Sequence, residues 1–208
     1  MLSDKRTRAL RTSISWAKQD SWEGVTTSNL TLSGGLDALS ARRGSVLAGD
    51  REFFKGYLLL GREQAPLWNT VLRPRSTAQA ASEALPVTEL FLYGGLEFGS
   101  TFSAATLAGD SGIAGSAELA WRLPEASAPS QLQESEIYSF IDSTWVWNEL
   151  RGVLILPKGR AASAGIGLRA HVMEKVQLQV ERAAIIEISR YTAGRDDWRL
   201  VFGVRSLL

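Results

Sequence analysis

The sequence predicts an all-β fold built from about nine antiparallel strands. Apolar and polar residues alternate over segments of about ten residues, which is the period of a strand with two different faces. Clusters of Gly, Pro, Ser and Asp separate these segments, as turns require. The 208 residues include no cysteine and carry a net charge of +1. Thiolate metal sites, disulfides and strong attraction to nucleic acid are therefore not expected.

The first four expected strands are loosely patterned. In the first of them, Leu10, Ile14 and Trp16 fall on one face. The fourth contains Pro74, which suits a strand edge or a bulge because proline cannot donate a ladder hydrogen bond. These strands are expected over residues 7–17, 22–33, 52–62 and 68–79.

The last five expected strands alternate more strictly. Between residues 175 and 184, Gln177, Gln179 and Glu181 share one face, and the residues between them are apolar. The same alternation occurs in the other segments, where Ser, Gly, Arg and Glu oppose Ala, Leu, Ile and Trp. These strands are expected over residues 115–123, around Phe140, and over 162–172, 175–184 and 199–208.

The strand spacing favours an antiparallel transmembrane β-barrel. A soluble sandwich turns every 8–12 residues, whereas alternating segments of about ten residues are typical of a barrel with a lipid-facing side and a wet lumen. Tryptophans then belong at the membrane interfaces, so Trp121, Trp145, Trp147 and Trp198 are expected to face outward. A soluble β-sandwich binding module is the alternative. No apolar run is long enough for a transmembrane helix.

A long glycine-rich connection separates the two groups of strands. It lies within a run from Ser76 to Trp121 that contains no Lys or Arg. It ends in Gly-Asp-Ser-Gly, which matches the nucleophile loop of trypsin-like proteases. In those enzymes the His precedes the Ser, but His171, the single histidine, follows Ser111. A turn is therefore the favoured interpretation. We expect no enzyme, no cofactor and no metal site.

Several segments, in order along the chain, resemble the C-terminal barrel of two-partner secretion transporters. These are the haemolysin secretion/activation proteins of the Omp85 superfamily. The similar segments are residues 85–95, 109–112 and 116–119, the Phe-x-Asp strand at 140–142, and 161–169. The resemblance identifies an in-folding loop motif at Gly94, Gly95, Phe98, Gly99, Ser100, Phe102, Gly109, Asp110, Ser111 and Gly112. It also identifies a strand motif facing that loop at Phe140, Asp142 and Thr144.

The resemblance implies a 16-stranded barrel in the bacterial outer membrane. It implies a translocation pore for a secreted haemolysin- or adhesin-like partner protein, with POTRA domains in the periplasm. On this basis residues 1–84 hold the strands before the loop, residues 85–113 are the in-folding loop, and residues 114–208 hold the last five strands. A loop inside a barrel should be rich in glycine and poor in unpaired charge.

The sequence departs from the family pattern at the loop tip. The family carries an Arg there that pairs with the strand Asp, but this chain aligns Ser100, or Gly99 after a shift of one, with that Arg. Thr144 replaces a family Gly. Asp142 therefore lacks its expected partner, and Arg169 is the nearest candidate cation by strand order. Glu134 and Glu136 border a loop and are expected to lie on a solvated rim.

The chain also differs from the family in size. About nine strands match the last nine of sixteen, and no POTRA domain or signal peptide is recognisable in the sequence. An open sheet in lipid would leave two edges of unpaired backbone groups. We therefore expect a fragment of a full transporter. A degenerate remnant without transport activity is the alternative within the same family.

Overall fold

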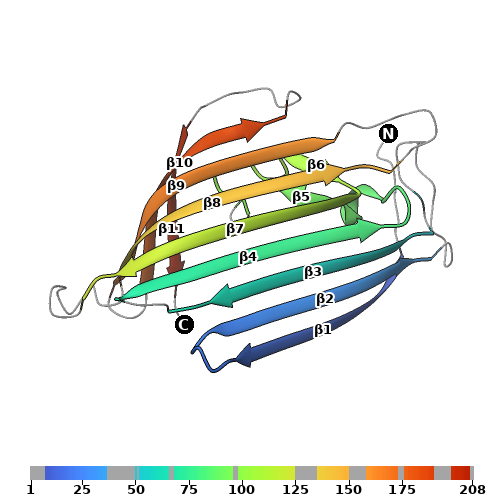
Figure 1. The fold of residues 1–208 in the computed structure, drawn as a ribbon. Helices are drawn as coiled ribbons and strands as arrows, with labels where there is room; N and C mark the ends of the chain where they lie inside the picture. The colour runs from blue at the N-terminus through green and yellow to red at the C-terminus, as the bar shows by residue number, and fades with distance from the viewer. Residues whose placement is uncertain are drawn as a thin grey trace.

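Nine long strands pair into one antiparallel sheet, as Figure 1 shows. The structure, a computed structural model, describes residues 8–36, 50, 52–65, 68–95, 98–124, 135–149, 158–172, 176–189 and 198–206. Two short strands, β5 and β6, pair only with each other. The strands are β1 (Ala9–Gln19), β2 (Val25–Gly35), β3 (Phe54–Glu63), β4 (Thr70–Ala81), β5 (Phe91–Tyr93), β6 (Leu107–Gly109), β7 (Ser111–Arg122), β8 (Glu136–Trp147), β9 (Gly159–Val172), β10 (Val176–Ile188) and β11 (Trp198–Ser206).

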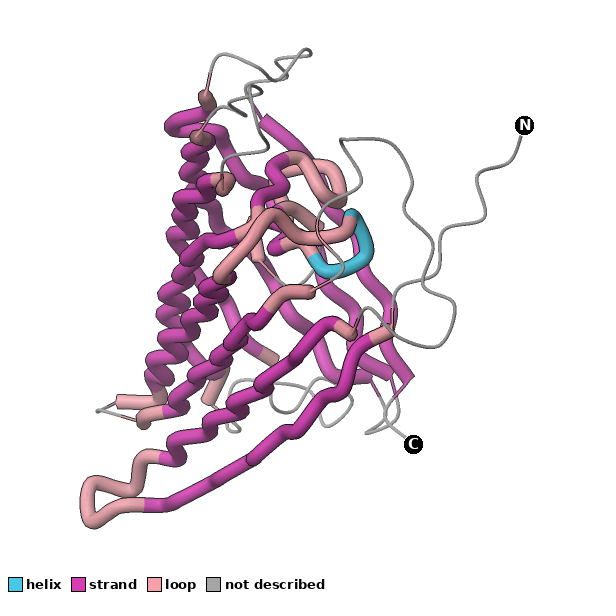
Figure 2. The backbone as a smooth tube through the Cα atoms, turned by 90° about the vertical axis from the view of Figure 1, so that its right-hand side faces the viewer, coloured by secondary structure: helices cyan, strands magenta, loops and turns pink. Residues whose placement is uncertain are grey.

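The sheet follows the order of the chain with one exception. β4 pairs with β7, because the segment between them, residues 82–110, leaves the sheet and is called the long loop below. The sheet curves strongly around this loop (Figure 2). β1 and β11 are its two edges, and no ladder joins them within the described residues. The predicted all-β fold and its nine antiparallel strands are confirmed, and the nine strands form an open sheet.

The outer face of the sheet is apolar and exposed. Every strand of the main sheet exposes at least one large apolar side chain on it. One continuous row crosses five strands, because the register pairs Trp121, Ile137, Leu168, Val180 and Phe202 in succession. Such a row does not belong on a protein surrounded by water. It argues against the soluble sandwich, which would bury an apolar face between two sheets.

The tryptophans lie on this outer face, as predicted. Trp121, Trp145 and Trp198 are 42%, 40% and 55% exposed. Trp147 lies beside Trp145, with ring centroids 5.4 Å apart and the ring planes tilted by 53°. Amphipathic indole rings prefer the boundary between lipid and water, so this placement fits a sheet that crosses a membrane.

The long loop packs against the inner face of the sheet. Its aromatic side chains form the largest part of a buried cluster that also includes Ala114 of β7, Val146 of β8 and Ala161 of β9. The loop members are Phe91, Tyr93, Phe98, Phe102 and Leu107. Apolar burial of this kind fixes the loop inside the curved sheet.

The inner face uses small residues to seat aromatic rings. A Cβ atom at Gly167 of β9 would lie 2.3 Å from the ring of Tyr138, which projects from the neighbouring strand β8. Only glycine leaves room for this ring to lie flat on the sheet. The Tyr138 ring in turn lies beneath Arg169, whose guanidinium carbon is 4.5 Å from the ring centroid.

Helical structure is minimal in the part of the chain that the structure describes. The long loop contains one 3-10 turn, η2 (Val87–Glu89), shown in cyan in Figure 2. No helix among the described residues is long and apolar enough to cross a lipid bilayer.

Candidate functional site

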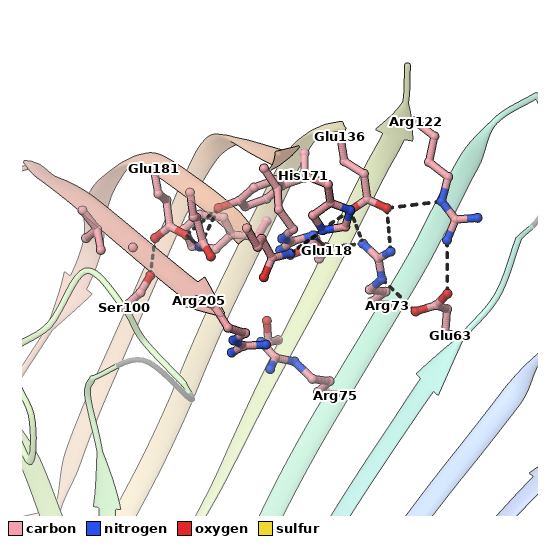
Figure 3. A pocket seen from close by; sticks show the side chains of 18 of the residues that line it. Glu63, Arg73, Arg75, Ser100, Glu118, Arg122, Glu136, His171, Glu181 and Arg205 are labelled. Atoms are coloured by element: carbon pink, nitrogen blue, oxygen red, sulfur yellow. Dashed lines mark hydrogen bonds and ion pairs between the residues drawn. The ribbon is translucent and has the colours of Figure 1, made fainter. Parts of the chain in front are cut away.

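A cavity of about 1200 Å³ lies on the inner face, next to the tip of the long loop. The loop contributes Gly99 and Ser100 to its lining, and the strands contribute mostly polar and charged side chains (Figure 3). Every strand of the main sheet from β3 to β11 contributes at least one charged residue: Glu63, Arg73, Glu118, Glu136, Arg169, Glu181 and Arg205. The alternating pattern of the sequence thus separates an apolar outer face from a charged inner cavity.

The base of the long loop is fastened by the Gly-Asp-Ser-Gly motif. The Asp110 carboxylate accepts backbone N–H groups from Leu85, at 2.7 Å, and Glu149, at 3.0 Å. The backbone carbonyl of Asp110 accepts the Gln79 side-chain amide at 2.9 Å. The Ser111 hydroxyl accepts the backbone N–H of Ala81 at 3.0 Å. The motif therefore joins the loop to β4 and to the segment after β8.

This geometry does not resemble a hydrolytic site. Ser111 begins β7 and pairs with Trp147 at the end of β8. His171 lies near the other end of the sheet, where its ring contacts the Gln177 amide at 2.9 Å. Gly109 ends β6, and Gly112 follows Ser111 inside β7. Among the described residues, no three His, Asp or Glu side chains gather as metal ligands.

Gly94 and Gly95, the first two residues of the in-folding loop motif, lie between β5 and the loop tip. Gly94 and Gly95 have φ values of 106° and 104°. Their N–H groups donate to the tip: Gly94 to Phe98 at 3.2 Å, and Gly95 to Gly99 at 3.3 Å and to Phe102 at 3.2 Å. These hydrogen bonds hold the loop tip, residues 98–102, against the residues that directly follow β5.

The conformation at Gly99 brings the tip close to the inner face. Its φ of 72° is in the left-handed region, and a Cβ atom there would lie 2.5 Å from the Tyr93 ring. Next to it, the Ser100 hydroxyl bonds the carboxylate of Glu181 on β10. The ring of Phe98 lies 5.5 Å from the guanidinium carbon of Arg75 on β4. The Phe102 ring packs against Tyr93, with centroids 5.6 Å apart.

The strand motif lies on the inner face of β8, toward the loop. Phe140, Asp142 and Thr144 are all buried and share that face. Asp142 interacts with the side chain of Ser116, the backbone N–H of Gly99 and the charge of Arg75. Thr144 donates its hydroxyl to a carbonyl of the neighbouring strand β7, at 2.9 Å.

The expected role of Arg169 beside Asp142 is wrong. Arg169 forms its ion pairs with Glu118, at 2.9 Å, and Glu136, at 2.7 Å. Strand order brought Arg169 near β8, but the register places it opposite Glu136 and not opposite Asp142. The cation whose charge reaches Asp142 is Arg75, from the other side of β7.

Four side chains form a closed ion-pair cluster, called the charge square below. Arg73 and Arg169 each contact both Glu118 and Glu136, at 2.7 to 2.9 Å. Figure 3 labels three of these residues, Arg73, Glu118 and Glu136, with Arg122 bonded to Glu136 beside them. The expectation of a solvated rim is therefore wrong for Glu136, whose side chain is only 5% exposed. Glu134 lies outside the described residues.

The charge square was not predicted from the sequence. Its members lie on four strands, β4, β7, β8 and β9, and two of its contacts are direct cross-strand pairs, Arg73 with Glu118 and Glu136 with Arg169. Glu118 and Arg169 sit on the polar faces that the alternation predicts for their strands. The pairing depends on the register, and register is not readable from one strand alone.

Comparison with known proteins identifies a similar fold. No family model matches the chain, and no curated protein matches it. Among solved structures, CdiB from Escherichia coli, a two-partner secretion transporter of the Omp85 superfamily, is similar with a TM-score of 0.77 and 16% sequence identity. The match covers 96% of this chain and 36% of the CdiB chain. It confirms the fold that the sequence resemblance implied, and this chain spans about a third of the length of that transporter.

Proposed function

We propose that this chain forms part of an outer-membrane pore that translocates a secreted partner protein of the haemolysin or adhesin type. The observation that carries the proposal is the division of the sheet into an exposed apolar face and a charged inner face that encloses a cavity. The similarity of its fold to CdiB supports the same conclusion. The pore would work by excluding lipid outside and offering a polar path inside.

The open edges of the sheet support a larger assembly. Along β1 and β11, one row of backbone N–H and C=O groups has no strand partner among the described residues. Each such group costs several kcal/mol in hydrocarbon. We therefore propose that further strands complete the barrel, and that this chain is a fragment of the full transporter wall.

The long loop occupies the inner face of this pore and would have to yield for a polypeptide to pass. Its base is held by hydrogen bonds to buried groups, whereas its tip borders the cavity. In this proposal the tip moves and the base stays in place.

A cross-linking experiment in the cells that make the protein tests the translocation proposal. A photo-reactive amino acid at His171, which lines the cavity, should form adducts with an exported polypeptide in transit. The matched control places it at Ile141, which is 52% exposed on the outer face, and should give lipid adducts only. Deleting the gene should remove the same polypeptide from the medium. An unchanged set of secreted proteins would contradict the proposal and favour a remnant without transport activity.

A further inference from the structure

Three consecutive residues of the loop tip each meet a charged side chain from a different strand. Residues 98–100 contact, in order, the guanidinium of Arg75 on β4, the carboxylate of Asp142 on β8 and the carboxylate of Glu181 on β10. The tip itself carries no charge and offers an aromatic ring, a backbone N–H and a hydroxyl. The charges that meet the tip therefore all belong to the inner face of the sheet.

These three contacts differ in how strongly they depend on the identity of the tip residue. Asp142 meets only the backbone N–H of Gly99, and nearly any residue supplies that group. Arg75 lies over the Phe98 ring at 5.5 Å, near the limit of a cation–π contact. The contact at Ser100 is the one in which a loop side chain bonds directly to a buried charge.

Glu181 depends on this contact to satisfy its carboxylate. It is only 5% exposed, and it accepts hydrogen bonds from Tyr138 at 3.0 Å, from Gln179 at 3.3 Å and from Ser100. Within the described residues it has no ion-pair partner. A buried carboxylate without a cation needs every available donor. Ser100 is the one donor of the three that comes from the loop.

We propose that Glu181 is the anchor that holds the loop tip in the cavity and sets how readily the tip is released. When the tip withdraws, Glu181 loses a donor, and this loss opposes opening. The anchor uses a neutral hydroxyl on the loop and a carboxylate on β10, which makes release easier than from an ion pair. The inference rests on the proposed function only in treating release of the tip as the opening of a pore.

A single introduced thiol reports the position of the tip. The chain has no cysteine, and Thr101 is 2% exposed with a hydroxyl that makes no hydrogen bond. Thr101→Cys therefore keeps the packing and yields a thiol that a membrane-impermeant maleimide reaches only when the tip withdraws. Labelling is measured on the protein in the outer membranes of the cells that make it.

Loss of the anchor should accelerate labelling. In the Thr101→Cys background, Glu181→Ala should raise the rate about tenfold or more, as expected for loss of a hydrogen bond to a charged group. Ser100→Ala should have a similar effect, and the double variant should be no faster than either, since both remove one interaction. Ser100→Thr, which keeps the hydroxyl, should label at the original rate. The control Glu187→Ala changes the same residue type on β10 at an exposed position and should have no effect.

The outcomes separate this inference from the proposed function. The anchor is overturned if Ser100→Ala is labelled at the original rate. It is also overturned if the labelling rate of the double variant rises by the product of the two single-variant effects. If Glu181→Ala does not assemble, as judged by loss of heat-modifiable gel migration, the Ser100→Ala and Ser100→Thr pair decides. If labelling responds as expected but no polypeptide cross-links at position 171, the anchor stands and the translocation proposal falls.

Discussion

A single carboxylate, that of Asp110, joins segments that are far apart in the chain. It is fully buried and accepts the backbone N–H groups of Leu85 and Glu149. Asp110→Asn leaves one acceptor and removes the charge, so we expect a loss of about 1.5–3 kcal/mol in stability at the base of the loop. Asp20→Asn is the control: Asp20 lies beside an exposed turn, where one of its oxygens accepts two backbone N–H groups and the other pairs with Arg62 at 2.7 Å. Urea titration of the detergent-solubilised protein measures both, and equal midpoints would contradict the prediction.

The loop residue Glu89 gives the long loop a dependence on pH. Burial alone would raise the pKa of Glu89, but hydrogen bonds from Arg11 and Lys55 more than offset it and hold the pKa below its ordinary value. The stabilisation is therefore present above about pH 4.3, the usual value in an unfolded chain, and is lost as the pH falls through the lower folded pKa.

This dependence predicts that the unchanged chain and Glu89→Gln differ in hydrogen exchange near neutral pH and become equal in acid. Glu89→Gln should show faster hydrogen exchange in residues 85–95 than the unchanged chain at pH 6. The two should converge as the pH falls well below 4, because protonation then removes the same charge from Glu89. Mass spectrometry of loop peptides measures the ratio of the exchange rates of the two proteins, and the intrinsic exchange rates cancel in this ratio. A ratio that stays constant with pH would show that Glu89 does not hold the loop.

At the scale of the strands, the charge square ties together four neighbouring elements. Glu136→Gln removes one of the two carboxylates that Arg73 and Arg169 share and leaves Glu118 as the other, and we expect a loss of about 2–4 kcal/mol in stability. Glu63→Gln is the matched control, since Glu63 also pairs with Arg73 but is 51% exposed, and it should cost much less. The midpoint of thermal unfolding, followed by gel migration, measures both. Comparable losses for the two variants would show that burial does not strengthen this network.

The strands also show what a sequence can and cannot predict here. In β10, strict alternation fixed the faces, and Gln177, Gln179 and Glu181 all line the cavity. The partners on those faces were not predicted, because Ser100 and Glu181 are 81 residues apart and meet only after the sheet has curved. The polar connection before Glu136 predicts a position on a rim, but the register directs its side chain inward to two arginines.

At the scale of the molecule, the outer face should contact lipid chains. Phospholipids brominated along their acyl chains quench tryptophan fluorescence by direct contact. We expect them to quench the reconstituted protein, and the variants Trp121→Phe, Trp145→Phe and Trp198→Phe should each remove part of the quenched signal. The exposure of all three rings on the apolar face is the reason. Trp22→Phe, in the exposed turn between β1 and β2, is the control and should leave the quenched fraction unchanged. Absence of quenching would place this face in water or against protein.

The contact between the loop tip and β10 has a consequence for the order in which the molecule is built. Neighbouring strands pair locally, so the ladder from β1 to β8 forms without the C-terminal part of the chain. The tip, however, bonds to Glu181, which is synthesised after three further strands of the sheet, β7, β8 and β9. Until β10 joins the sheet, the tip lacks its hydrogen bond to Glu181, although β4 and β8 already place Arg75 and Asp142 beside it. The hydrogen bond between the tip and Glu181 can therefore form only once β10 has joined the sheet.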